Sequence, residues 1–165
     1  MSKASGPLYV VHFRRRREGV TDFARRVALL KSGEPRLVVR KTNKFVVVQV
    51  TKLGEKGDAT VASATSRQLA KHGFAGKANT PSAYLTGLLV GKLAKAKGVS
   101  KCVADFGRHT ATKGSLLYAA VQGALDAGLQ VPLGEGVAPS RERIDGKHLK
   151  NASGFEQAKQ KIMAA

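Results

Sequence analysis

The sequence predicts a mixed α/β fold, with a sheet that starts as three antiparallel strands and helices packed against it. Short Val-rich segments, joined by tight polar or glycine-containing connections, cluster between residues 36 and 64. Longer segments with apolar residues at helical spacing follow them, and a short apolar strand over residues 101–106 lies between two of these. Helices that alternate with strands in this way are typical of an α/β layer.

The first expected elements are a helix and three strands. Thr21 or Asp22 can cap a helix over residues 23–31, and Pro35 blocks its extension. The strands are expected over residues 36–41, 45–51 and 59–64, with a tight polar turn at 42–44 and a glycine-containing loop at 53–58. The short connections predict that the three strands are antiparallel.

The remaining expected elements are helices. A short one is expected over residues 67–72. Thr80 is the candidate N-cap of the clearest helix, which has Pro81 at its first position and ends at Gly98. Two more helices are expected over residues 113–127 and, more weakly, 155–162.

The length of 165 residues is about that of one domain, and a hydrophobic content of 42% is enough for a core. We divide the chain into a basic N-terminal arm (1–20), a globular α/β domain (21–130) and an irregular C-terminal tail (131–165). Apolar residues precede the charges in the first segment, which is the wrong order for a secretory signal, and no long apolar run follows. We therefore expect a cytoplasmic protein without a membrane span.

Positive charge is the strongest signal in the composition. Lys and Arg number 29 against 11 Asp and Glu, a net charge of +18, and half of this excess lies in the first 45 residues. Such a chain repels itself unless a polyanion neutralises it, and the common partners are nucleic acid and an anionic membrane. The single cysteine, Cys102, is expected in the core, and the four histidines lack ligand spacing. We therefore expect no disulfide, no metal and no cofactor.

The hairpin over residues 36–50 predicts a sheet with one apolar and one cationic face. Alternation puts Leu37 and Val39 on one side of the first strand. Arg36 and Arg40 lie on the other side, so helices that cover the apolar face would leave these arginines and the polar turn free. An ordinary solvated face usually mixes charge signs, but the hairpin contains no acid. We therefore predict contact with RNA or DNA.

Four consecutive arginines, Arg14 to Arg17, cannot lie in a core. We expect them to be extended, because a consecutive run points all round a helix, whereas an extended run can follow a phosphate backbone. Tyr9, His12 and Phe13 precede the run and can stack on exposed bases. A nuclear-import signal or a disordered tail is the alternative.

Three further motifs are weaker evidence for a functional site. The segment GLLVGKL at 87–93 lacks the spacing and hydroxyl of a phosphate-binding loop, and we expect its two glycines to allow close helix-to-sheet packing. Arg108 lies in a polar loop before a helix N-terminus, which either binds an anion or is structural. Asp58 and Asp105 could share a metal as in a nuclease, but such chemistry usually needs three or more clustered acids.

Four blocks that follow one another in order carry a family resemblance. They are FRRRREGVTDFARRVALLKSGEPRLVVRKTNKFVVVQV, GDATVASATS, NTPSAYLTGLLVGKLAKAKG and GSLLYAAVQGALDAGLQVP. Together they resemble the large-ribosomal-subunit protein family numbered eighteen in the universal scheme, whose eukaryotic members are called ribosomal protein L-five. The first block and the AYLTGLL helix look archaeal or eukaryotic rather than bacterial.

The resemblance implies a ribonuclease-H-like topology without catalytic acids, and therefore no enzyme. It implies a protein of the cytoplasmic ribosome that binds 5S rRNA and anchors it in the central protuberance of the large subunit. The implied partners also include large-subunit rRNA and neighbouring proteins, among them universal family five. The expected RNA-binding residues are Tyr9, His12, Phe13, Arg14, Arg15, Arg16, Arg17, Arg25, Arg26, Arg36, Arg40, Lys41, Thr42, Asn43, Lys44, Arg141, Arg143, Lys147 and His148, with Arg108 added from the polar loop.

Two other functions fit the charge and the fold. One is a nucleic-acid-processing enzyme on a similar fold, which metal-dependent RNA cleavage lost on changing Asp58 or Asp105 would favour. The other is a DNA-compacting protein, which equal affinity for duplex DNA and 5S rRNA would favour.

Overall fold

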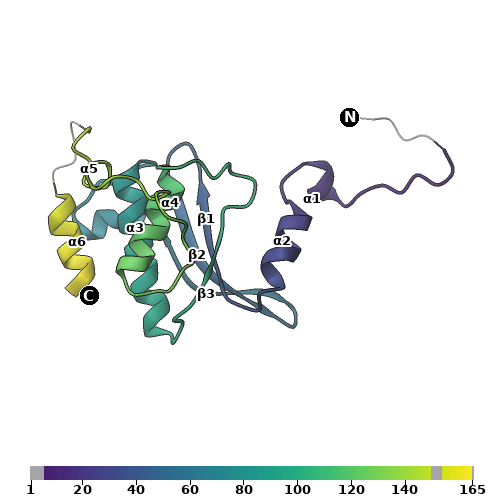
Figure 1. Cartoon of the computed structure of the whole chain (residues 1–165), viewed down its shortest axis with the longest axis horizontal. Coiled ribbons are helices and arrows are strands. Elements are labelled where there is room, and N and C mark those ends of the chain that lie inside the picture. Colours follow the sequence, from purple (N-terminus) through teal and green to yellow (C-terminus); the bar gives the residue numbers. More distant parts are fainter. Residues whose placement is uncertain (1–5, 150–153, 165) are drawn as a thin grey trace.

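The computed structural model describes residues 6–149 and 154–164 and has a layered α/β arrangement (Figure 1). Its elements are α1 (Arg14–Arg17), α2 (Phe23–Leu30), β1 (Arg36–Lys41), β2 (Val46–Gly54), β3 (Gly57–Thr65), the 3-10 helix η1 (Ser66–His72), α3 (Thr80–Ala96), β4 (Val103–Asp105), α4 (Leu116–Asp126), α5 (Arg141–Ile144) and α6 (Phe155–Ala164). Over the described ranges, no helix has the length and apolar character that crossing a membrane requires.

The four strands form one mixed sheet in the order β3-β2-β1-β4. β2 is antiparallel to both of its neighbours, whereas β1 and β4 are parallel. Leu37 pairs with Val50 and Val39 with Val48, so these apolar side chains share one face of the sheet. The predicted antiparallel start and the mixed α/β class are confirmed.

The connection between β2 and β3 differs from the predicted loop. Both strands continue until Gly54 pairs with Gly57, so the segment 53–58 contains a two-residue turn at Glu55 and Lys56. The longer ladder gives partners to backbone N–H and C=O groups that a loop would leave to water. The prediction was wrong because it took the two glycines to end the strands.

α3 and α4 cover one face of the sheet, and glycines bring the two helices together (Figure 1). A Cβ at Gly87 would lie 2.0 Å from the Ala120 carbonyl oxygen, and one at Gly123 would lie 2.1 Å from the Tyr84 carbonyl oxygen. A Cβ at Gly91 would also meet α4. The glycines of the 87–93 segment therefore allow close helix-to-helix packing, not the helix-to-sheet packing that we expected.

Each helix considered below starts within three residues of its predicted start. Asp22, one of two predicted candidates, caps α2 by accepting from the Arg25 N–H. Asn79 rather than Thr80 caps α3, because its side chain accepts from the Ser82 N–H and Thr80 is already helical. α4 begins three residues later than predicted.

The C-terminal part is less irregular than we expected. The predicted terminal helix is present as α6, which buries Phe155, Ala158 and Ile162. The Phe155 ring lies 6.4 Å from that of Phe74 and 5.8 Å from that of Tyr84, measured between centroids. α6 therefore packs on the outer side of α3, and α5 precedes it. The division into arm, domain and tail stays a prediction.

Cys102 is fully buried among the core residues, as predicted. Burial, with a smaller contribution from the charge of Glu34, raises the pKa of its thiol to about 11. The thiol is therefore protonated at neutral pH and behaves as a small apolar side chain.

Candidate nucleic-acid interface

The two faces of β1 have opposite character. Leu37 and Val39 are fully buried in the core beneath the helices. Arg36, Val38 and Arg40 alternate with them on the other face, which we call the open face. α2 lies on this side of the sheet, and α3 and α4 lie on the opposite side (Figure 1). The alternation predicted for the hairpin is therefore confirmed.

Five side chains, Arg26, Arg36, Arg40, Asp58 and Asp105, form what we call the arginine–carboxylate cluster on the open face. Arg36 is central, because its Nη1 donates to Asp105 Oδ2 and its Nη2 to Asp58 Oδ2, each at 2.6 Å. Arg26 donates to the same Asp58 oxygen at 2.7 Å. Arg40 donates to Asp105 Oδ1 at 3.0 Å and to the Asp105 carbonyl oxygen at 2.6 Å. The cluster thus joins α2, β1, β3 and β4.

The cluster keeps both carboxyl groups ionised. Burial by itself raises the pKa of Asp105. The charge of Arg40, the Gly107 N–H at 2.8 Å and the Arg36 hydrogen bond lower the pKa, and together they outweigh the effect of burial. The net pKa of Asp105 therefore lies below its ordinary value. The pKa of Asp58 is also lowered, because hydrogen bonds and charges from its two arginine partners outweigh the effect of burial.

Arg36 is not free on the open face, contrary to our prediction. The residue is 3% exposed, because its guanidinium group lies between the carboxylate of Asp58 from β3 and that of Asp105 from β4. A buried charge is tolerated when it is paired and hydrogen-bonded in this way. Asp58 and Asp105, which we considered as metal ligands, instead direct oxygens at Arg36 and hold the sheet and α2 together.

α1 and α2 are held to the rest of the molecule by polar contacts. Arg25 Nη1 donates to the Gly107 carbonyl oxygen at 2.8 Å, and Arg108 donates to the Gly19 carbonyl oxygen. The φ of Gly19 is +65°, a backbone conformation that favours glycine over residues with a Cβ. None of the eight α2 residues is buried. Arg108 therefore links its loop to the N-terminal segment.

The arginine run forms one helical turn, α1, rather than the extended segment that we expected. The Phe13 carbonyl oxygen accepts from two N–H groups of the run at 3.0 Å, so the turn satisfies backbone groups that an extended arm would leave to water. The run is exposed throughout. Arg15 Nε donates to Thr21 Oγ1 at 2.9 Å, which directs this side chain back toward α2.

The hairpin turn is exposed, as predicted, and Lys41 and the arm aromatics are exposed too. These residues are Tyr9, His12, Phe13, Lys41, Thr42, Asn43 and Lys44. Thr42 Oγ1 fixes the turn by accepting from the Phe45 N–H at 3.0 Å and donating to the Phe45 carbonyl oxygen at 2.9 Å. The turn therefore presents Lys44, and the adjacent end of β1 presents Lys41, from an ordered position.

The C-terminal candidates lie elsewhere. Arg141, Arg143, Lys147 and His148 are exposed in and after α5, which is on the far side of the helical layer from α2 (Figure 1). The structure therefore does not bring these four residues together with the arm and the hairpin.

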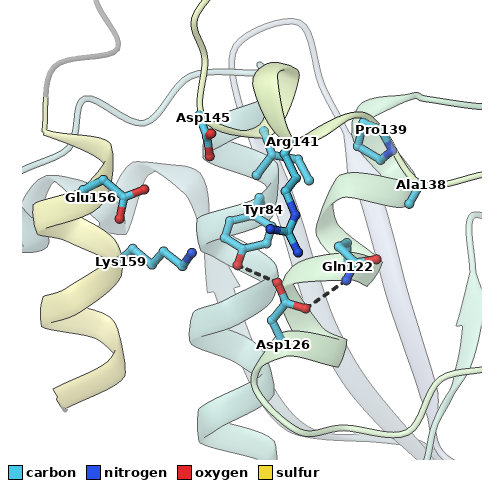
Figure 2. A pocket seen from close by; sticks show the side chains of 10 residues that line it. Tyr84, Gln122, Asp126, Ala138, Pro139, Arg141, Asp145, Glu156 and Lys159 are labelled. Carbon is cyan, nitrogen blue, oxygen red and sulfur yellow. Dashed lines mark hydrogen bonds between the residues drawn. The ribbon is translucent and has the colours of Figure 1, made fainter.

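Arg141 lines a polar pocket of about 520 Å³ among α3, α4, α5 and α6 (Figure 2). Tyr84 Oη donates to Asp126 Oδ2 at 2.7 Å, and Gln122 donates to Asp126 Oδ1 at 2.8 Å. Burial, with the Asp126 carboxylate next in importance, raises the pKa of Tyr84, so its hydroxyl remains a donor. Lys159 lies 5.7 Å from the Tyr84 ring centroid. This lining mixes acids and bases, whereas the hairpin carries only basic charges.

Comparison with known proteins identifies relatives of this chain. The family model described as "Ribosomal large subunit proteins 60S L5, and 50S L18" matches residues 8–98. The large ribosomal subunit protein uL18 of Methanoregula boonei is 47% identical over 147 residues, which cover 88% of this chain and 84% of the relative. The proteins of the same name from Caldivirga maquilingensis and Methanobrevibacter smithii are 51% and 50% identical, over 88% and 90% of this chain and 72% and 77% of the relatives.

These matches bear out the predicted resemblance over most of the chain. They also bear out its archaeal character, because the three relatives come from archaea. Relatives with this name are structural parts of the ribosome and not enzymes. The chain therefore belongs to the family of ribosomal large-subunit proteins that this model describes, and its role is that of a structural component of the large subunit.

Proposed function

We propose that the protein binds 5S rRNA and anchors it in the central protuberance of the large subunit. Contacts to large-subunit rRNA and to neighbouring proteins, including universal family five, belong to the same proposal. Membership in a family of large-subunit proteins supports it, because such a protein works among rRNA and other ribosomal proteins. The finer role rests on the resemblance and on the distribution of charge.

The observation that carries the proposal is a set of exposed cations on the arm and the hairpin. Within the part of the chain that the structure describes, Arg14 is the one member of this set with an ion pair, at 4.0 Å from Glu18. α1, Arg25, Lys41 and Lys44 are exposed. The carboxylates of Asp58 and Asp105 already pair with arginines of the cluster. Exposed cations displace counterions from a phosphate backbone, and this release supplies much of the affinity for RNA.

The residues of the proposed interface have different roles. The exposed arginines and the hairpin lysines are proposed to contact phosphates, and the arm aromatics to stack on unpaired bases. Arg36 is proposed to position β1 and Asp105, since it is buried and cannot reach RNA. Shape recognition by the fixed hairpin, rather than a base code, is proposed to select folded RNA.

The hairpin lysines test this proposal directly. Replacing Lys41 and Lys44 together by Ala removes two phosphate contacts, so 5S rRNA affinity should fall roughly 10-fold. The slope of log K against log salt concentration should become shallower by about two. Filter binding at several salt concentrations measures both quantities.

The matched control is the pair Lys71→Ala and Lys161→Ala. Both lysines are exposed, in η1 and α6, and the control removes the same charge from outside the arm and the hairpin. Equal losses of affinity in the two double variants would show that net charge, not this interface, binds the RNA. Duplex DNA as a second probe tests the DNA-compacting alternative.

A further inference from the structure

A cavity of about 240 Å³ lies between the N-terminal helices and the open face. Its charged lining residues are Arg15, Asp22, Arg25, Arg26, Arg40 and Asp105, which come from α1, the α2 cap, α2, β1 and β4. Four arginines therefore line one partly open cavity from both sides of the contact between arm and sheet.

The two acids in the lining are already engaged. Asp105 accepts from Arg36, Arg40 and the Gly107 N–H. Asp22 accepts from the Arg25 N–H as the cap of α2. With four arginines and two carboxylates, the lining has a net charge of +2, which favours an anion in the cavity.

The arginines keep donors for such an anion. Each guanidinium group has five N–H donors in a planar fork. Among the described residues, Arg15 uses Nε toward Thr21, Arg25 uses Nη1 toward Gly107, and Arg26 uses Nη2 toward Asp58. Their other N–H groups can bind phosphate oxygens in the bidentate geometry that arginine favours.

The cavity lies beside α2, whose attachment to the sheet is weak in apolar contacts. α2 has no fully buried residue, and hydrogen bonds of Arg25 to Gly107 and of Arg26 to Asp58 join it to the rest of the molecule. Its positive charges also repel those of β1 across the cavity. An anion that bonds Arg15 or Arg25 on one side and Arg40 on the other would relieve this repulsion and join the two parts.

We infer that one phosphate group of the RNA backbone enters this cavity and ties the N-terminal helices to the open face. The inference rests on the proposed RNA binding and adds to it a single subsite within the cavity, distinct from the diffuse attraction of exposed cations. The subsite predicts that exposed arginines of the same run contribute unequally to RNA affinity.

The test compares two arginines of the same helical turn. Arg15 lines the cavity, whereas Arg17 is exposed in the same run and is not part of the described lining. Arg15→Gln should weaken 5S rRNA binding about tenfold, and Arg17→Gln only about threefold. Both variants lose one positive charge, but only Arg15→Gln loses the proposed contact with a phosphate in the cavity. Circular dichroism and thermal melting check that both variants are folded.

A second readout uses small phosphates and needs no RNA. Dimethyl phosphate, a phosphodiester, should shift the amide NMR signal of Gly107 saturably in the wild type and in Arg17→Gln, but not in Arg15→Gln. Inorganic phosphate is the parallel titration. A response to inorganic phosphate alone would make the cavity a site for free phosphate and would overturn the inference.

The two proposals fail in different ways. Equal losses of RNA affinity in Arg15→Gln and Arg17→Gln, or no saturable shift at Gly107 with dimethyl phosphate, would overturn the subsite while leaving RNA binding in place. A wild-type protein that does not bind 5S rRNA would overturn the proposed function. The dimethyl phosphate titration would still test whether the cavity binds a phosphodiester.

Discussion

Arg36 is a buried arginine whose charge is balanced by carboxylates on both sides. Asp105 comes from the parallel neighbour of β1, and Asp58 comes from β3 at the other edge of the sheet. Removal of one partner from a buried pair leaves an uncompensated charge, which costs about 3 to 5 kcal/mol. This cluster is therefore important for stability, independently of any RNA contact.

The first prediction concerns Asp105→Asn, which leaves Arg36 and Arg40 without their shared charge partner. The free energy of unfolding should fall by about 3 kcal/mol at pH 7, measured by urea denaturation. Glu135→Gln, at an exposed site, is the control and should change it by less than about 0.5 kcal/mol.

The same variant should change the response to acid. The pKa of Asp105 is lowered in the folded protein, so its contribution is complete above the unfolded pKa near 4 and is lost as pH falls through the folded pKa. The stability difference between wild type and Asp105→Asn should therefore shrink from about pH 4 downward. A difference that stays constant to pH 2 would contradict the assigned pairing.

The buried role of Arg36 could not be read from the sequence. Alternation correctly put Arg36 and Arg40 on one face, because strand geometry fixes that from neighbouring residues alone. Their partners lie 69 and 65 positions away along the chain, and the pairing depends on β4 docking beside β1. The signal that was available was an Asp at the end of a short apolar strand.

At the scale of elements, the helices with apolar spacing were the most predictable part. α2, α3 and α6 are present close to the expected residues, because caps and periodicity are local properties. The arginine run and the β2–β3 connection were predicted wrongly. In both places, backbone hydrogen bonds that the residue types do not reveal decide the conformation.

The α3–α4 contact gives an element-scale prediction. Gly123→Ala should lower the free energy of unfolding by about 2 kcal/mol, because the new methyl group meets the Tyr84 backbone 2.1 Å away. This steric cost should exceed the gain of about 1 kcal/mol from the better helix propensity of Ala. Thermal melting measures the outcome.

Gly134→Ala is the matched control, because its Cβ would meet Val137 at an ordinary distance of 4.0 Å. A melting temperature of Gly123→Ala equal to or above that of wild type would show that the two helices can separate without cost.

At the scale of the whole molecule, the two faces of the sheet differ in what covers them. The arm, α2 and the hairpin carry exposed cations beside the open face, whereas the other face of the sheet is covered by α3 and α4, with α5 and α6 outside them (Figure 1). Composition predicted a polyanionic partner, and the resemblance predicted which one. The packing of α6 on α3 was not predictable, because it joins segments about 70 residues apart.

The most direct test of the account is a lysine footprint of the protein bound to 5S rRNA, with acetylation of each amine measured by mass spectrometry. The account predicts that RNA protects Lys41 and Lys44 on the hairpin and leaves Lys71 and Lys161 on the helical side as reactive as in the free protein. Protection of Lys71 and Lys161 with the hairpin lysines still reactive would contradict it.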